Sequence, residues 1–235
     1  MVLKGRLGLI AKKADYCKIV CDIGTDHAYI PIYLVRKGIC KKVIATDIKK
    51  GPVYIARNNI SKYGLESFIE TRTGYGLKPL EENELDTIII AGMGGMLIID
   101  ILADGYEKAR KAYRLILQPM NAVEVVREWL YQNRFSILDE ELACEGEKIY
   151  NVIVAKWTNT KVSCEKLHCI VGKKLIEKKD PLLEKYIEKK VNELDKIING
   201  LKKSKDENNK IKEYTVLKNE LCLLIGRRDS IGRKM

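Results

Sequence analysis

Residues 18–27 read KIVCDIGTDH, and this stretch decides the fold. Residues 19–21 are apolar and lead into Asp22, a pattern typical of a buried strand. Gly24 then permits a sharp turn into a helix expected over residues 28–38. In an open α/β sheet, ligands bind beyond the carboxyl ends of the strands, near the switch in strand order. The turn from Asp22 to His27 is therefore the first candidate binding site.

Strands and helices alternate on both sides of this stretch. Leu3, Leu7 and Ile10 recur at helical spacing, so we expect an amphipathic helix over residues 3–14. Further strands are expected at 42–47, 68–71, 86–91 and 113–117, and helices at 51–63, 95–102 and 122–132. The last two strands, 135–142 and 148–157, read as a hairpin. This predicts an α/β, Rossmann-like class I methyltransferase fold, with a doubly wound, mostly parallel seven-stranded sheet and a terminal antiparallel hairpin.

The charges in the first turn indicate which kind of cofactor the sheet binds. A dinucleotide site would show Gly-x-Gly-x-x-Gly, so that helix-end amides meet a pyrophosphate. Here Gly24 is the single glycine of the turn, and carboxylates stand at Asp22 and Asp26. Two anions disfavour a pyrophosphate but suit the sulfonium and ammonium of S-adenosylmethionine. We therefore expect that cofactor to contact this turn, including Thr25 and His27; an ordinary strand-to-helix turn is the alternative.

Two later loops supply candidates for the nucleoside end of the cofactor. Asp47 ends the second strand, where an acidic residue accepts both ribose hydroxyls of S-adenosylmethionine or of NAD. Ile48 follows it directly. The third strand is followed by Gly74, Tyr75 and Gly76, in a loop that approaches the adenine in this fold.

The loop after the fourth strand, residues 91–95, reads AGMGG and faces the methyl group and the acceptor in this fold. Its glycines leave space for a flat acceptor, and we expect Ala91, Gly92 and Met93 to contact the cofactor. After the fifth strand, Gln118 and Asn121 can each donate and accept hydrogen bonds toward an acceptor base; helix capping is the alternative for Asn121. The candidate catalytic residues are Asp26, Gly92, Met93, Gly94, Gln118 and Asn121.

Motifs of two other methyl transfers are missing. No Asn/Asp-Pro-Pro-Tyr/Phe follows the fourth strand, and no Pro-Cys nucleophile occurs. Direct transfer to a neutral ring nitrogen such as adenine N1 requires no strong base, so positioning and desolvation would supply most of the acceleration. His27 beside Asp26 is a candidate base, and an orienting or packing role is the alternative.

The composition changes near residue 158, and helical patterns alone follow. We expect one domain at 1–158 and a helical domain at 159–235, with a helix over residues 165–179 and an antiparallel coiled-coil hairpin after it. The apolar seam of that hairpin breaks at about residues 203–209 and comprises Ile187, Val191, Leu194, Ile198, Leu201, Tyr214, Leu217, Leu221 and Leu224. Residues 160–235 hold 20 Lys and Arg against 12 Asp and Glu, which favours a polyanionic partner such as RNA; a solvated helical face is the alternative.

Several classes of protein are disfavoured by composition. Hydrophobic residues make up 46% of the chain, which excludes general disorder, and no apolar run of about 18 residues predicts a membrane span. The start lacks a long apolar stretch, so we expect no signal peptide and a cytoplasmic protein. The seven cysteines include no Cys-x-x-Cys pair, so we expect reduced thiols and no metal site, Cys164, His168 and Cys169 included.

Taken together, these motifs resemble one family, the bacterial tRNA (adenine-22-N1)-methyltransferases known as TrmK. The resemblance spans roughly residues 3–157. It is carried by Arg6-Leu7, by residues 22–31 (DIGTDHAYIP), 45–48 (ATDI) with Gly51, Pro52 and Ala56, 72–77 (RTGYGL), 91–95 (AGMGG) and 117–120 (LQPM).

The resemblance implies methylation of N1 of adenine 22, in the D-loop region of tRNA, and a C-terminal coiled coil that helps to hold the tRNA. It also implies that the cofactor site is lined by Asp22, Gly24, Asp26, His27 and Asp47, and that Gly92, Met93 and Gly94 face the methyl group. Tyr75 departs from the family pattern, where a small acidic or amide residue is expected. We expect the enzyme to be a monomer that meets an unpaired or extruded base.

Two other functions remain open at this point. An NAD-linked Rossmann oxidoreductase would use the same sheet, although the second and third glycines of its motif are missing. A non-catalytic RNA-binding protein could retain the methyltransferase fold.

Overall fold

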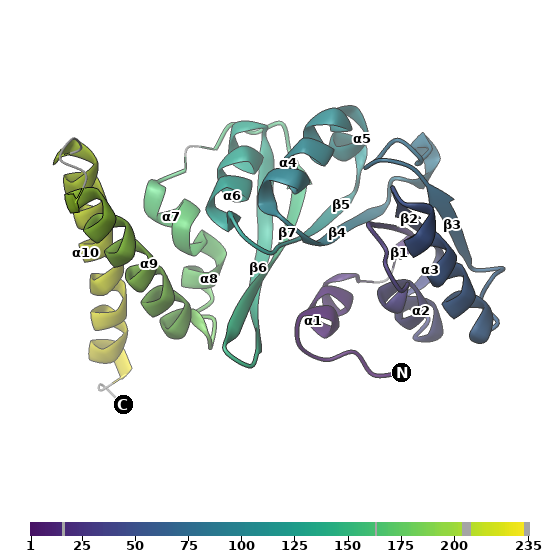
Figure 1. Ribbon diagram of the computed structural model, residues 1–235, viewed down its shortest axis with the longest axis horizontal. Coiled ribbons are helices and arrows are strands. Elements are labelled where there is room, and N and C mark those ends of the chain that lie inside the picture. The colour runs from purple at the N-terminus through teal and green to yellow at the C-terminus, as the bar shows by residue number, and fades with distance from the viewer. Residues whose placement is uncertain (16, 163, 204–207, 233–235) are drawn as a thin grey trace. The chain divides into compact units, whose positions relative to one another are not determined.

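The stretch KIVCDIGTDH forms the central strand β1 (Cys17–Ile23) and the turn that follows it. β1 pairs in parallel with β2 (Cys40–Asp47) on one side and with β4 (Thr87–Met93) on the other. Its centre is fully buried because helices cover both faces of the sheet. The computed structural model describes residues 1–15, 17–162, 164–203 and 208–232 (Figure 1).

The sheet contains seven strands in the order β3-β2-β1-β4-β5-β7-β6. The remaining strands are β3 (Ile69–Thr73), β5 (Arg114–Pro119), β6 (Phe135–Glu145) and β7 (Lys148–Trp157). β7 is antiparallel to both β5 and β6, and the other neighbours are parallel. The prediction of a mostly parallel sheet with a terminal hairpin is confirmed. The chain winds from β1 outward to β3 and then returns to β4, so the strand order reverses between β1 and β4.

Helices cover the two faces of this sheet (Figure 1). The first face carries α1 (Gly5–Lys13), α2 (Tyr29–Arg36) and α3 (Lys50–Lys62); the second carries α4 (Gly95–Asp104), α5 (Tyr106–Lys111) and α6 (Val123–Gln132). Right-handed crossovers require this division, because the chain builds the sheet outward in opposite directions from β1 and from β4. α5 and the short 3₁₀ helix η1 (Glu82–Glu84) were not predicted from the sequence.

The chain divides into two compact units, Met1–Ser163 and Cys164–Met235; the predicted division at 158–159 lies slightly earlier. In the second unit, α9 (Leu183–Lys203) packs against α10 (Asn208–Gly232). Five members of the predicted seam are buried: Ile187, Leu194, Ile198, Leu217 and Leu221. A coiled-coil geometry for the pair stays a prediction, and part of the expected break at 203–209 lies outside the described residues.

Two details of the second unit differ from expectation. The single helix expected at 165–179 is divided into α7 (Lys166–Val171) and α8 (Lys173–Glu177), because Gly172 between them has a φ of 97°, outside the helical region. The expectation that all seven cysteines are thiols is also wrong, since Cys164 and Cys169 form a disulfide. These two residues lie five positions apart in sequence, a spacing that a motif search for Cys-x-x-Cys does not detect.

Candidate active site

A cavity of about 320 Å³ opens at the switch point, beyond the carboxyl ends of β1 and β4. Its lining comes from three separate parts of the first unit: the start of α1, the turn from β1 into α2, and the end of β4. The predicted site residues that the structure brings together here are Asp22, Gly24, Thr25, Asp26, His27, Ala91 and Gly92. The position matches the general rule for ligand sites in open α/β sheets.

A second cavity, of about 500 Å³, opens at the opposite edge, where β1, β4 and β5 begin. Two of its charged side chains, Asp86 and Arg114, are already engaged within the protein. Asp86 Oδ2 accepts a hydrogen bond from Lys18 N at 2.8 Å, and Arg114 Nη1 lies 2.7 Å from Asp15 Oδ2. None of the predicted site residues lines this cavity, so the switch-point cavity is the candidate active site.

The backbone of the turn after β1 is bonded in a way that disfavours a phosphate. The amides of Gly24 and Thr25 both donate to the carbonyl oxygen of Thr46 at the end of β2, each at 2.8 Å. In a dinucleotide-binding domain, amides at this position point toward the pyrophosphate. Here they tie the turn to the neighbouring strand, which leaves side chains rather than amides to meet a ligand.

Asp22 places a buried carboxyl group at the floor of this cavity. The residue is 6% exposed, and burial raises the pKa of its carboxyl group to about 6, while the nearby Thr25 hydroxyl opposes the rise. Thr25 Oγ1 is itself buried and has no partner at hydrogen-bond geometry in the described part of the chain. A bound cation would favour the ionised form of Asp22, and a polar ligand would satisfy the Thr25 hydroxyl.

Asp26 and His27 form the rim of the turn. Asp26 Oδ2 lies 3.2 Å from His27 Nε2, and both side chains are partly open to solvent. The imidazole stacks on the ring of Tyr29, with 5.1 Å between centroids and 12° between planes. Asn59 Nδ2 also donates to the carbonyl oxygen of His27 at 3.1 Å. These contacts fix the orientation of His27 and of the Asp26 carboxylate beside it.

Gly24 is required at its position for two reasons. Its φ of 78° lies in the left-handed region, which side chains with a Cβ rarely adopt. A Cβ there would also collide with Cε of Met93, which reaches across from the end of β4. The Gly24 turn and the predicted methyl-facing residue Met93 are therefore in direct van der Waals reach of each other.

The loop after β4 is held by the two amide side chains predicted to face the acceptor. Gln118 is fully buried, and its Oε1 accepts hydrogen bonds from Gly92 N at 3.2 Å and from Arg6 Nη1 at 2.8 Å. Its Nε2 donates to the carbonyl oxygen of Pro119. Asn121 Oδ1 accepts from Gly95 N at 3.0 Å, at the start of α4. Both side chains thus shape the 91–95 loop, and contact with an acceptor stays a prediction for each.

The residues predicted for the nucleoside end lie along the ends of β2 and β3, outside the lining of the cavity. Asp47 ends β2 and accepts from Lys49 N at 2.8 Å, while its carbonyl oxygen accepts from Gly74 N. Ile48 is exposed beside it. Tyr75, between Gly74 and Gly76, lies with its ring centroid 5.6 Å from Lys78 Nζ. The structure thus places Asp47 next to the 74–76 loop, and a ribose-and-adenine subsite there stays a prediction.

With this geometry in place, comparison with known proteins identifies the family. A family model described as TrmK, tRNA (adenine(22)-N(1))-methyltransferase, matches residues 20–224. The chain belongs to the TrmK family. The resemblance inferred from the motifs is confirmed.

Individual TrmK relatives agree in sequence and in fold. The tRNA (adenine(22)-N(1))-methyltransferase of Bacillus subtilis is 42% identical over 154 residues, which cover 66% of this chain and 65% of that protein. The crystal structure of B. subtilis TrmK superposes with a TM-score of 0.84 at 33% identity, covering 95% of this chain and 99% of that one. Streptococcus pneumoniae Sp1610, solved in complex with S-adenosyl-L-methionine, gives a TM-score of 0.82 at 31% identity, covering 94% and 98%.

One charged residue of the cavity, Arg6, had no role assigned from sequence. Arg6 belongs to the TrmK-like opening motif, and α1 carries its guanidinium into the lining beside Gly92. The local sequence around Arg6 does not indicate a ligand site, because its neighbours read as an ordinary amphipathic helix. The fold alone joins it to residues about 90 and 110 positions away, Gly92 and Gln118.

Within the described ranges, no group of three or more His, Cys, Asp or Glu side chains is arranged to hold a metal ion. No described helix has both the length and the apolar composition of a membrane span.

Proposed function

We propose that this chain transfers a methyl group from S-adenosylmethionine to N1 of adenine 22 in tRNA. The single observation that carries the proposal is the buried Asp22 carboxyl at the floor of a switch-point cavity whose turn amides are already bonded to Thr46. In that arrangement a carboxylate faces the ligand, and the amides that would bind a pyrophosphate are already hydrogen-bonded within the protein. Membership of the TrmK family supplies the acceptor.

The residues of the cavity fit the cofactor by their chemistry. Bound S-adenosylmethionine supplies an electrophilic methyl group on a positively charged sulfur. Asp22 and Asp26 would hold its cationic groups, and the buried Thr25 hydroxyl would gain the hydrogen bond it lacks. Asp47 would accept from the ribose hydroxyls, with Ile48 and the 74–76 loop beside the adenine.

The 91–95 loop would form the wall against which the acceptor base lies. Gly92, Met93 and Gly94 carry little polar side-chain chemistry, so they exclude water and leave the base room rather than exchange protons with it. Adenine N1 is a neutral nucleophile with an available lone pair, and its methylation needs no proton acceptor in the same step. The buried Gln118 side chain supports this loop through the hydrogen bond that its Oε1 accepts from Gly92 N. In this proposal Asp26 and His27 position the cofactor and no general base is required.

The second unit would contribute binding to tRNA. Among its exposed lysines, Lys185, Lys189 and Lys196 follow helical spacing along one side of α9. A row of cations suits the phosphate backbone of RNA, and such contacts fix the position of the substrate. This would help to offset the few kcal/mol required to unstack the target base. We further propose that the enzyme acts as a monomer in the cytoplasm.

The test is methylation of defined tRNA transcripts by the full chain with labelled S-adenosylmethionine. We expect label in a transcript with adenine at position 22 and none in a matched transcript with guanine there, with the product mapped as N1-methyladenosine. Equal labelling of both transcripts would overturn the assigned acceptor. Cofactor binding without transfer to any RNA would favour a non-catalytic RNA-binding protein instead.

A further inference from the structure

The Arg6 guanidinium is a cation with few partners in the first unit. Its side chain donates one recorded hydrogen bond within the described residues, from Nη1 to Gln118 Oε1, and its Cζ lies 5.5 Å from the Tyr150 ring centroid. Arg6 Nε is buried and has no hydrogen-bond partner in the same ranges. An arginine has five N–H donors, and a partly buried guanidinium normally faces a carboxylate or a phosphate. The recorded ion pairs give Arg6 no such partner.

The cavity around Arg6 has a matching division of charge. Its lining contains two carboxylates, Asp22 and Asp26, on the turn after β1. Among the described residues of this lining, Arg6 is the one with a permanent positive charge, since His27 is the other basic residue and faces Asp26. A ligand that satisfies both sides carries cationic groups and an anionic group close together. The amino-acid end of S-adenosylmethionine has this composition, with a sulfonium, an ammonium and an α-carboxylate.

We infer that Arg6 binds the α-carboxylate of the cofactor's methionine portion. This rests on the proposed cofactor and adds a specific residue to its site. Gln118 orients the guanidinium through Nη1, and the terminal Nη2 remains for the carboxylate, since Nε is buried. A guanidinium suits this role because its donors form a planar fork that matches a carboxylate.

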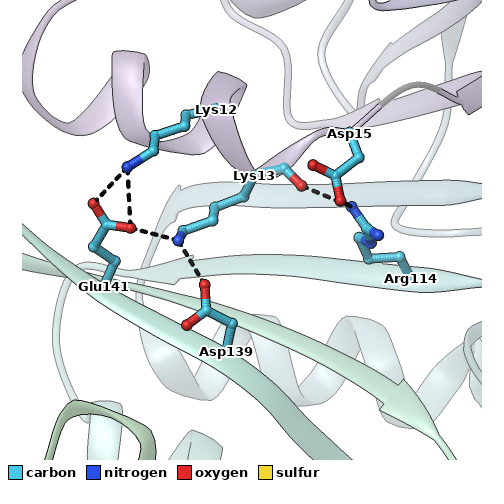
Figure 2. Close-up of polar contacts among 6 residues, drawn as sticks. All are labelled: Lys12, Lys13, Asp15, Arg114, Asp139 and Glu141. Carbon is cyan, nitrogen blue, oxygen red and sulfur yellow. Dashed lines mark hydrogen bonds and ion pairs between the residues drawn. The ribbon is translucent and has the colours of Figure 1, made fainter. Parts of the chain in front are cut away.

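The anchoring of α1 places Arg6 firmly at the cavity. At the first turn, Arg6 N donates to Glu145 Oε1 at 2.7 Å. At the last turn, Lys13 Nζ pairs with Asp139 at 2.6 Å and with Glu141 at 2.5 Å, and Lys12 also pairs with Glu141 (Figure 2). The carbonyl oxygen of Lys13 accepts from Arg114 Nη1 at 3.0 Å. Because both ends of α1 are bonded to other elements of the unit, little ordering of Arg6 is needed when a ligand binds.

The test compares two cofactors by calorimetry on the full-length protein: S-adenosylmethionine and its decarboxylated form, which keeps the sulfonium, the amine and the adenosine. For the unmodified protein we expect the decarboxylated form to bind about 10- to 100-fold more weakly, the usual value of a hydrogen-bonded charge contact. In Arg6→Met, the affinity for S-adenosylmethionine should fall by a similar factor, while the affinity for the decarboxylated form should change less than about twofold. Arg6→Lys keeps the positive charge but lacks the planar pair of donors, so it should recover part of the preference for S-adenosylmethionine over its decarboxylated form.

The matched control is Arg36→Met, the same substitution on an arginine of the same unit that stacks on Tyr63 away from the cavity. It should leave both affinities unchanged. Equal weakening of both cofactors by Arg6→Met would show that Arg6 only supports the 91–95 loop through Gln118. Unchanged cofactor binding with weakened tRNA binding would assign Arg6 to a phosphate instead. If the unmodified protein bound neither cofactor, the proposed function itself would fail; equal binding of both cofactors by that protein would overturn the role of Arg6 alone.

Discussion

At the scale of single residues, Asp22 couples the stability of the protein to its proposed ligand. Burial raises the pKa of its carboxyl group from an ordinary value of 3.8 to about 6. A carboxyl group with a raised folded-state pKa favours folding when it is protonated, and that contribution is lost as the pH rises from about 4 through 6. The ionised Asp22 that a cationic cofactor needs is therefore a source of instability in the free protein. Such conflicts between stability and function are common at binding sites.

We expect Asp22→Asn to stabilise the free protein at pH 7.5 by roughly 3 kcal/mol, because burial raises the pKa of the carboxyl group from 3.8 to about 6, and to abolish cofactor binding. At pH 4, where Asp22 is largely protonated, the two proteins should unfold at similar temperatures. Both tryptophans, Trp129 and Trp157, lie in the first unit, so thermal unfolding followed by tryptophan fluorescence reports on that unit. A lower melting temperature for the variant at pH 7.5 would contradict this account.

Gly24 gives a second prediction at this scale. Gly24→Ala combines a left-handed φ with a collision against Met93, whereas Gly38→Ala has a similar φ of 66° and nothing near its Cβ. Gly38→Ala should therefore cost about 1 kcal/mol of stability, the expense of the backbone conformation alone. Gly24→Ala should cost more and should also weaken cofactor binding, and shortening the neighbour in Gly24→Ala/Met93→Ala should recover part of the stability. Equal losses from the two single variants, measured by urea unfolding, would argue against the contact.

At the scale of elements, the sequence predicted the strands well because each is an apolar run bounded by turn residues. The 86–91 run became β4 (Thr87–Met93), and the Gly24 turn fell at the switch point as expected. Sequence reasoning failed where a tertiary contact or one backbone angle decides the outcome. α5 has six residues and no strong periodicity, and the angle at Gly172 interrupts a pattern that otherwise continues. The position of Arg6 at the cavity was beyond prediction because it depends on the docking of α1.

The docking of α1 yields a prediction for two neighbouring lysines. Lys13 is 10% exposed and pairs with Asp139 and Glu141, whereas Lys12 is 68% exposed and pairs with Glu141 alone (Figure 2). Exposed ion pairs contribute little, so Lys12→Met should change stability by less than about 0.5 kcal/mol. Lys13→Met removes the cation from a partly buried group of charges and should cost about 1–3 kcal/mol. Hydrogen exchange of the α1 amides should accelerate in Lys13→Met and stay unchanged in Lys12→Met; the same rates in both would contradict the anchoring role of Lys13.

At the scale of the whole molecule, charge is divided between the two units. The proposed catalytic site lies in the first unit, and most of the basic surplus lies in the second. Composition alone predicted this division, because a count of charges requires no knowledge of the fold. The lysines that touch RNA could not be chosen from the count, since that choice depends on which side of each helix faces solvent.

We expect replacement of Lys185, Lys189 and Lys196 by alanine to weaken tRNA binding and to reduce the slope of log Kd against log salt by up to about 2. Cofactor affinity should be unchanged. The matched control replaces Lys18, Lys37 and Lys41, three exposed lysines near the edge where β1 and β2 begin, opposite the cofactor edge. Equal losses of tRNA affinity in the two triple variants would mean that tRNA binding depends on net charge rather than on these lysines of α9.

The most direct test of the central claim is the affinity of the full chain for S-adenosylmethionine between pH 5 and 8. Because a cationic cofactor binds the ionised Asp22, affinity should be constant above about pH 7 and should fall through pH 6, to about one tenth at pH 5. His27→Gln should keep this profile if Asp22 is the responsible group. Affinity that does not change with pH, or no binding at any pH in folded protein, would contradict the account.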